Sequence, residues 1–268
     1  MLIKIIDLIR YYTPEILKVK VGYIPFAFVG LIYKILKIEI LNTRKFKIHL
    51  DNDALNFTTR GMLITGYYES GEQKLLKDYL QKDLPVIEFG AGIGLSTMQI
   101  RNHVDKKIYS VEADKLSFGL IKKNLEINNI NKDVYLYNNA IDYQKKFILF
   151  KSYDMFLSNH VEDNNIDIPR LWKLRGEYEI ETLKLSDIIK KNSIKEYQLV
   201  CDIEGKEIEL IKSGDIDNKM CKIIIIDLHD MKYEGKSYTY EDLSRLIQDL
   251  GYKVKNQSVD QVVYESTY

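Results

Sequence analysis

The chain alternates between short apolar runs and amphipathic segments over most of its length. Apolar runs typical of buried strands lie at residues 85–89, 107–111, 133–138, 196–201 and 222–228. Segments with apolar positions three and four residues apart, typical of helices, lie at residues 72–80, 95–103, 115–128, 206–212 and 240–250. Strands that alternate with helices through short connections predict a parallel sheet covered on both faces.

The last two predicted strands break this alternation. Residues 252–255 and 261–265 are joined by only a few polar residues. A parallel crossover needs about a dozen residues, so these two strands must be antiparallel. We therefore predict an α/β fold, Rossmann-like, with a doubly wound and mostly parallel sheet that ends in a C-terminal antiparallel hairpin.

Two regions lie outside the regular alternation. Residues 1–60 are predicted to form an N-terminal extension of helices and short strands, and residues 61–268 the main domain, with an insertion or cap at 141–195. The longest uncharged apolar stretch, residues 21–33, is shorter than the ~20 residues that span a bilayer. We expect it to form a helix packed on the main domain. Its flanking lysines leave a second interpretation open, in which residues 1–40 make a weak peripheral contact with a membrane.

Composition and charge narrow the range of functions. Lysine plus arginine and aspartate plus glutamate both number 39, so the formal net charge is zero. Proteins that bind nucleic acid are usually basic, so we expect no nucleic-acid partner. Two cysteines and four histidines without short spacings predict neither a disulfide framework nor a metal site. A reducing, cytoplasmic location is expected.

A glycine-rich turn follows the first strong strand. Its sequence, Glu-Phe-Gly-Ala-Gly-Ile-Gly at 88–94, allows a tight bend and close approach of a ligand to the backbone. A dinucleotide fingerprint needs its third glycine one residue later, where Leu95 stands. The turn therefore predicts an adenosine-containing ligand other than a dinucleotide.

Two acidic residues define that ligand further. Glu112 closes the second strand, where a carboxylate accepts hydrogen bonds from both ribose hydroxyls. Glu88, directly before the turn, repels a pyrophosphate and attracts a cation. S-adenosylmethionine combines an adenosine with a cationic sulfur and an amino group, so we predict it as the cofactor. The predicted cofactor-binding residues, with the last two beside the adenine, are Glu88, Phe89, Gly90, Ala91, Gly92, Gly94, Glu112, Ala113, Asn139 and Ala140.

Residues 88–94, 111–114 (Val-Glu-Ala-Asp) and 201–205 (Cys-Asp-Ile-Glu-Gly) together resemble the FkbM-type S-adenosylmethionine-dependent methyltransferases. The resemblance runs from about Gly66 to about Tyr252, and it implies a class I methyltransferase-like fold. It also implies O-methylation, often of a hydroxyl of a sugar or other polyol in glycan or secondary-metabolite pathways. The sequence departs from the family pattern at Glu88, Gly92 and Asp227, where aspartate, asparagine and glutamate are common.

Acidic and histidine side chains at later strand ends are candidates for the chemistry. A hydroxyl acceptor benefits from a positioned general base. Asp202 and Glu204 follow the fourth strand and His229 follows the fifth, so all three are predicted catalytic residues at the edge that carries the glycine turn. Asp202 or His229 is the predicted base, whereas Glu204 has the alternative role of stabilising the start of the next helix. Binding of Mg²⁺ or another divalent ion by these residues and Asp227 is a further alternative. Selection of the acceptor is expected in the insertion, which contains His160, Arg170, Trp172 and Arg175.

Other classes of function stay open. A nicotinamide-dependent oxidoreductase with a Rossmann fold shares the strand–helix order, but the glycine spacing and the final hairpin disfavour it. A nucleic-acid base methyltransferase is disfavoured because the chain lacks an Asn/Asp-Pro-Pro-aromatic tetrad. A non-catalytic scaffold that retains an S-adenosylmethionine pocket is the third alternative, and acids at every expected strand end argue mildly against it.

Overall fold

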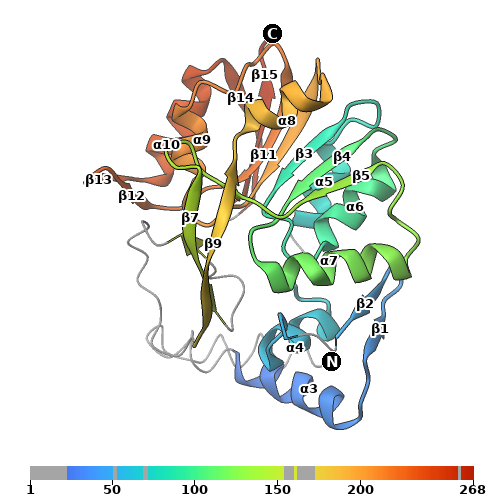
Figure 1. The fold of residues 1–268 in the computed structure, drawn as a ribbon. Coiled ribbons are helices and arrows are strands. Elements are labelled where there is room, and N and C mark those ends of the chain that lie inside the picture. Colours follow the sequence, from blue (N-terminus) through green and yellow to red (C-terminus); the bar gives the residue numbers. More distant parts are fainter. Residues whose placement is uncertain (1–22, 51–52, 69–71, 154–159, 162–172, 259–260) are drawn as a thin grey trace.

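A seven-stranded sheet forms the centre of the computed structural model, which describes residues 23–50, 53–68, 72–153, 160–161, 173–258 and 261–268 (Figure 1). In spatial order its strands are β14 (Tyr252–Ser258), β15 (Gln261–Ser266), β11 (Cys221–Asp227), β10 (Tyr197–Cys201), β3 (Val86–Phe89), β4 (Ile108–Val111) and β5 (Val134–Tyr137). The strands from β11 to β5 pair in parallel, whereas β15 is antiparallel to both β11 and β14. The predicted doubly wound sheet with a C-terminal antiparallel hairpin is confirmed.

Helices cover both faces of this sheet. On one side lie α5 (Glu72–Tyr79), α6 (Leu95–His103) and α7 (Lys115–Ile127), and on the other α8 (Leu185–Asn192), α9 (Glu207–Lys212) and α10 (Tyr240–Asp249). Side chains alternate between the two faces along each strand. In β3, Val86 accordingly packs in the cluster of α5 and α6, while Ile87 and Phe89 pack in the cluster of α8, α9 and α10.

The N-terminal elements gather at the far side of α7 from the sheet (Figure 1). They are α3 (Ile24–Ile35), β1 (Ile40–Asn42), β2 (Lys47–His49) and α4 (Phe57–Thr65). Helix α3 confirms the helix expected at 21–33, and α4 continues through the predicted boundary at residue 60. The β1–β2 hairpin is attached to α7 because Asn124 and Asn128 accept hydrogen bonds from the backbone of His49 and Lys47, at 2.9 and 2.8 Å.

A second sheet projects from the main one after β5. Its strands, in spatial order, are β6 (Ala140–Ile141), β9 (Leu174–Leu183), β7 (Phe147–Tyr153) and β8 (His160–Val161). A buried ion-pair network fixes its base to α9, because the Lys206 ammonium contacts Asp142 at 3.0 Å and Glu209 at 2.6 Å. These strands and α8 lie where the insertion or cap at 141–195 was predicted, and the bounds of that region stay a prediction.

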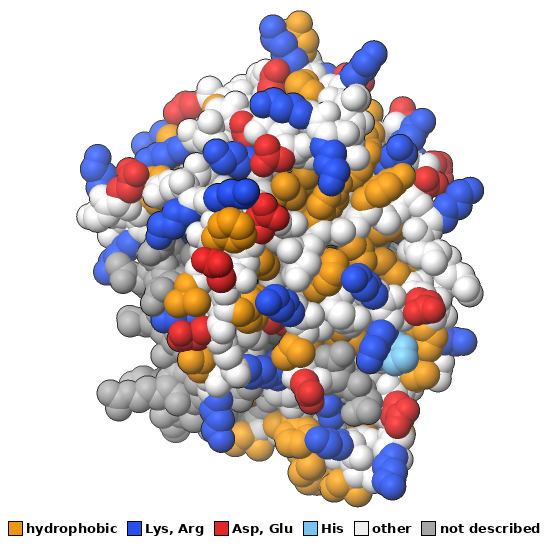
Figure 2. All heavy atoms as spheres, viewed as in Figure 1, with side chains coloured by type: hydrophobic (Ala, Val, Ile, Leu, Met, Phe, Trp, Pro, Cys, Tyr) orange, Lys and Arg blue, Asp and Glu red, His pale blue; other side chains and the backbone are white. Residues whose placement is uncertain are grey.

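The remaining elements are a short hairpin and the loops. The hairpin consists of β12 (Met231–Tyr233) and β13 (Lys236–Tyr238), between β11 and α10. On the face drawn in Figure 2, lysine and arginine side chains are interspersed with acidic ones over the main domain. This mixture agrees with the zero net charge of the chain.

Candidate active site

The glycine turn and the turn after β10 meet at the carboxyl edge of the sheet. From β3 the strand order continues to β4 on one side and to β10 on the other, and such a reversal creates a crevice for ligands. The Asp202 amide donates to the Phe89 carbonyl at 2.9 Å. A Cβ atom on Gly90 would lie 1.6 Å from the Asp202 carbonyl oxygen, so only glycine allows the two turns to touch.

Most amides of the glycine turn already have partners within the protein. Gly90 and Ala91 both donate to the Val111 carbonyl, at 3.0 and 3.1 Å, and Gly94 donates to the Ala91 carbonyl at 2.8 Å. The Gly92 amide donates to the Glu112 carboxylate at 2.8 Å. A pyrophosphate-binding turn needs such amides free for the phosphate oxygens. This turn therefore suits a ligand without phosphates.

Glu112 is placed to receive an adenosine. One carboxylate oxygen accepts from Gly92 and the other from the Asp114 amide at 2.7 Å. Each carboxylate oxygen has two lone pairs, so each retains one for a ribose hydroxyl. Burial raises the pKa of Glu112 to about 8, and the nearby charge of Asp114 adds to this effect. The residues present therefore fit the ribose diol of S-adenosylmethionine.

Glu88 lies behind the turn, on the face of β3 covered by α5 and α6. It is 1% exposed, and one carboxylate oxygen accepts hydrogen bonds from the hydroxyls of Thr97 and Ser110. The other oxygen, Oε1, is buried and has no hydrogen-bond partner among the described residues. Burial raises the pKa of this carboxyl. Contact between Glu88 and the amino group of the cofactor stays a prediction, and the unsatisfied oxygen is the atom available for it.

Two other predicted cofactor residues have buried side chains. Phe89 is fully buried on the opposite face of β3, and Ala91 is 2% exposed. Both are part of hydrophobic clusters. A ligand in the crevice therefore meets the backbone of these residues rather than their side chains.

The turns after β4 and β5 are linked by asparagine side chains. Asn138, which sequence reasoning missed, donates from Nδ2 to the carbonyl of Glu112 at 2.8 Å. Asn139 instead donates to the Glu181 carbonyl on β9 at 3.1 Å, and Ala140 is buried where β6 begins. The two consecutive asparagines at 138 and 139 could have indicated this role, because the side-chain amide of either residue can bind the backbone of a turn.

The projecting sheet packs on the same turn. The Tyr178 hydroxyl of β9 accepts from the Lys115 amide at 2.8 Å and donates to the Ala113 carbonyl at 3.1 Å. Ala113 and Ala140 contact the small apolar cluster of Ile148, Phe150 and Ile180. The insertion therefore supports the backbone directly after Glu112, a role that no local sequence pattern indicates.

The three predicted catalytic residues are brought together at the ends of β10 and β11. Cys201 pairs with Ile226, which places Asp202 beside Asp227. The His229 Nδ1 atom lies 3.8 Å from the Asp227 carboxylate. Contact with Asp227 raises the pKa of His229 to about 9, although partial burial opposes this shift. Burial and then repulsion by Asp227 raise the pKa of Asp202 to about 7, while His229 lowers it.

Glu207 shapes the turn that carries these acids. It is fully buried, and its two carboxylate oxygens accept from the amides of Ile203 and Gly205, both at 2.9 Å. Glu204 has a φ of 51° at the apex of this turn, and burial raises its pKa well above the usual value. Glu207 thus makes the helix-start contacts considered for Glu204. The position of Glu207 in the first turn of the predicted helix could have indicated this role, because acids are favourable there.

The structure describes two of the four candidates in the insertion. Arg170 and Trp172 lie outside the described residues, whereas His160 and Arg175 belong to β8 and β9. Within the described part of the chain, no group of three or more His, Cys, Asp or Glu side chains is arranged to hold a metal ion.

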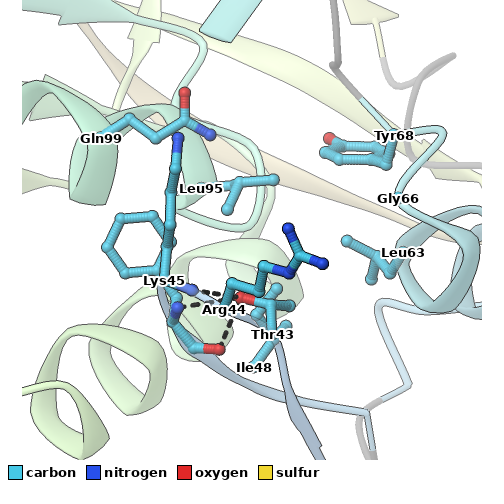
Figure 3. A pocket seen from close by; sticks show the side chains of 10 residues that line it. Thr43, Arg44, Lys45, Ile48, Leu63, Gly66, Tyr68, Leu95 and Gln99 are labelled. Atoms are coloured by element: carbon cyan, nitrogen blue, oxygen red, sulfur yellow. Dashed lines mark hydrogen bonds between the residues drawn. The ribbon is translucent and has the colours of Figure 1, made fainter.

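A separate cavity of about 220 Å3 lies beside the start of α6 (Figure 3). Its floor is apolar and includes Ile48, Leu63 and Leu95, and the guanidinium of Arg44 points into it. Thr43 holds the β1–β2 turn in shape by accepting from the Phe46 amide at 2.9 Å. No residue of this cavity was among the predicted site residues.

One family of known proteins matches this chain. The Methyltransferase FkbM domain matches residues 88–254, which contain the glycine turn and the turns after β4, β5, β10 and β11. No curated protein sequence matches the chain.

Several solved structures are similar at low identity. TrmK of M. capricolum, in complex with S-adenosyl-homocysteine, is 9% identical, with a TM-score of 0.44 over 73% of this chain and 68% of its own. Magnesium protoporphyrin IX methyltransferase of Synechocystis PCC 6803, with bound S-adenosylmethionine, is 10% identical, with a TM-score of 0.44 over 78% and 83%. The M. jannaschii tRNA m1G37 methyltransferase is 11% identical, with a TM-score of 0.45 over 85% and 56%.

Proposed function

The chain belongs to the FkbM methyltransferase family, whose members depend on S-adenosylmethionine, and from this premise we propose that it methylates a hydroxyl oxygen of a sugar, polyol or related metabolite. The observation that carries the proposal is the grouping of Asp202, Asp227 and His229 beside the glycine turn. Transfer to a hydroxyl needs a base, and this grouping supplies one.

The carboxyl edge of β3 and β4 would hold the cofactor. Glu112 would accept hydrogen bonds from the ribose hydroxyls, and Gly90 would allow the ligand to approach the backbone. The turn after β5 would border the adenine through the backbone of Asn139 and Ala140, because the Asn139 side chain donates to the Glu181 carbonyl. When bound, S-adenosylmethionine supplies an electrophilic methyl group on a cationic sulfur.

Asp202 is the general base in this proposal. With a pKa of about 7 it is substantially ionised at neutral pH and still basic enough to accept a proton. Its carboxylate would take the proton of the acceptor hydroxyl, and the bound cofactor would supply the methyl group to that oxygen. His229, with a pKa of about 9, is a cation at pH 7 and therefore does not serve as the base. Its charge keeps Asp202 ionised beside Asp227.

The test uses a donor labelled with carbon-13 in the methyl group. The protein is incubated with pools of monosaccharides, polyols and oligosaccharides, and products are followed by mass gain and by the chemical shift of the new methyl carbon. We expect O-methyl products with wild type and a loss of about 10²–10⁴-fold in turnover with Asp202→Asn.

The matched control is Asp230→Asn, which changes an acid near the same loop outside the Asp202–Asp227–His229 grouping. Turnover by this variant should stay near that of wild type. Methyl groups found only on nitrogen or carbon, or full turnover by Asp202→Asn, would contradict the proposal.

A further inference from the structure

Helix α3 has a continuous apolar stripe that the fold leaves exposed. Ile24, Phe28, Leu31 and Ile35 recur at intervals of three and four residues, which places them on one helix face. Phe28 is 63% exposed and Ile35 is 69% exposed. The neighbouring apolar side chains of Tyr23, Ile32, Leu36, Ile38 and Phe57 are also exposed. Figure 2 shows apolar side chains gathered at the end of the molecule where Figure 1 places α3.

The fold does not need this stripe. Helix α3 is attached to α4 through its opposite side, where Phe26 and Gly30 are buried. A Cβ atom on Gly30 would lie 1.9 Å from the Phe57 carbonyl oxygen, and one on Gly61 would lie 1.9 Å from the Phe26 carbonyl oxygen. The two backbones are therefore in direct contact, and α3 packs on α4 with its apolar stripe facing outward. Contiguous apolar patches of this kind mark interaction sites.

The charge around the stripe indicates the kind of partner. Residues 23–38, which contain α3 and the residues directly after it, include the cations Lys34 and Lys37 and no acid, although the chain as a whole is neutral. Helix α3 itself has no acidic residue in its first turn and Lys34 in its last. An apolar stripe bordered by lysines is complementary to a surface with apolar chains beneath anionic groups.

We propose that α3 docks the protein on an anionic lipid surface, with its stripe among the acyl chains and its lysines at the headgroups. None of the described helices is long and apolar enough to cross a membrane, so α3 lies in the plane of the surface. Pairing with a second copy through the same stripe would bring two sets of lysines together without a neutralising charge. The lipid surface supplies that charge, and the proposal is independent of the acceptor of the methyl group.

The test is flotation of the full chain with vesicles of phosphatidylglycerol and phosphatidylcholine, or of phosphatidylcholine alone. We expect binding to the anionic vesicles that weakens as salt is raised, and much weaker binding to the neutral ones. Phe28→Ser combined with Ile35→Ser should lower the partition coefficient by about tenfold or more. Lys37→Gln should lower it by about fivefold.

The control is Phe147→Ser combined with Val254→Ser, which removes two similarly exposed apolar side chains outside this region and should leave binding unchanged. Phe28→Trp gives a second readout, because its emission should shift to the blue on anionic vesicles as the ring leaves water. Absence of wild-type flotation, equal flotation of the Phe28→Ser/Ile35→Ser variant, or a solution dimer that this variant dissociates would overturn the proposal.

Discussion

The side chains of Asp202 and His229 differ in charge near neutral pH although they share one edge of the sheet. Burial and the neighbouring Asp227 raise the pKa of Asp202 to about 7, and the contact with Asp227 raises that of His229 to about 9. A base acts only when deprotonated, so turnover should rise as the pH increases through about 7. The pH profile of kcat measures this rise.

The His229→Gln variant tests the effect of the histidine on this profile. Without the imidazolium, Asp202 faces Asp227 and Glu207 alone, so its pKa should rise and the acidic limb should move to higher pH. An unchanged profile in His229→Gln would show that the histidine is only a structural residue at the end of β11.

Glu112→Gln tests the cofactor site. The amide keeps one acceptor oxygen but replaces the other with a donor, so it cannot accept from Asp114, from Gly92 and from both ribose hydroxyls at once. A buried donor left without an acceptor costs about 1–3 kcal/mol, so affinity for S-adenosylmethionine should fall on the order of 10–100-fold. Calorimetric titration measures it. The variant Glu126→Gln, at an acid at the end of α7, should bind as wild type does.

At the scale of elements, the site depends on two turns that touch. Gly90 has a φ of 83°, and its backbone lies against the Asp202 carbonyl. Glu207 holds the other turn by accepting from two of its amides. The glycine turn and the turn that carries Asp202 therefore form one structural unit, although more than a hundred residues separate them in the sequence.

Gly90→Ala should disrupt this unit. The new Cβ would lie 1.6 Å from a backbone oxygen, and an alanine at this φ is also strained. We expect the free energy of unfolding to fall by about 1–3 kcal/mol or more, together with loss of cofactor binding. Gly119→Ala in α7 is the matched control, since nothing lies within 4 Å of its Cβ position and alanine should stabilise the helix by up to about 1 kcal/mol. Urea unfolding of both variants distinguishes them, and equal stabilities would refute the contact.

At the scale of the whole molecule, the N-terminal elements and the cofactor turn share one side chain. Asn124 of α7 is fully buried, donates to the Ile93 carbonyl at 2.9 Å and accepts from the His49 amide at 2.9 Å. It therefore joins β2 to the glycine turn. Changes in the N-terminal elements are expected to reach the cofactor site through this residue.

Asn124→Ala removes the partners of the half-buried His49 amide and of the buried Ile93 carbonyl. Such a loss costs about 1–3 kcal/mol per group, so urea unfolding should show a clear loss of stability and cofactor affinity should fall with it. The exposed Asn131, changed to alanine, should alter neither. If affinity were unchanged in Asn124→Ala despite the lower stability, the N-terminal elements and the cofactor turn would be independent.

The order of strands and helices, the final hairpin and the residues of the two turns followed from the sequence. Periodicity, short connections and glycine spacing are local properties, so they can be recognised in the sequence without knowledge of the fold. The acids Glu112, Asp202 and Glu204 and the histidine His229 were identified in the same way, because the ends of parallel strands meet at one edge.

Only the tertiary structure decided how these residues divide their roles. Glu88 is turned behind the glycine turn because alternation along β3 directs it under α6, and Glu207 rather than Glu204 holds the second turn. The pKa values of Asp202 and His229 arise from burial and from Asp227 on a neighbouring strand, and the exposure of α3 arises from its glycine contact with α4. Each of these depends on distances between residues far apart in the chain, and local sequence patterns do not contain those distances.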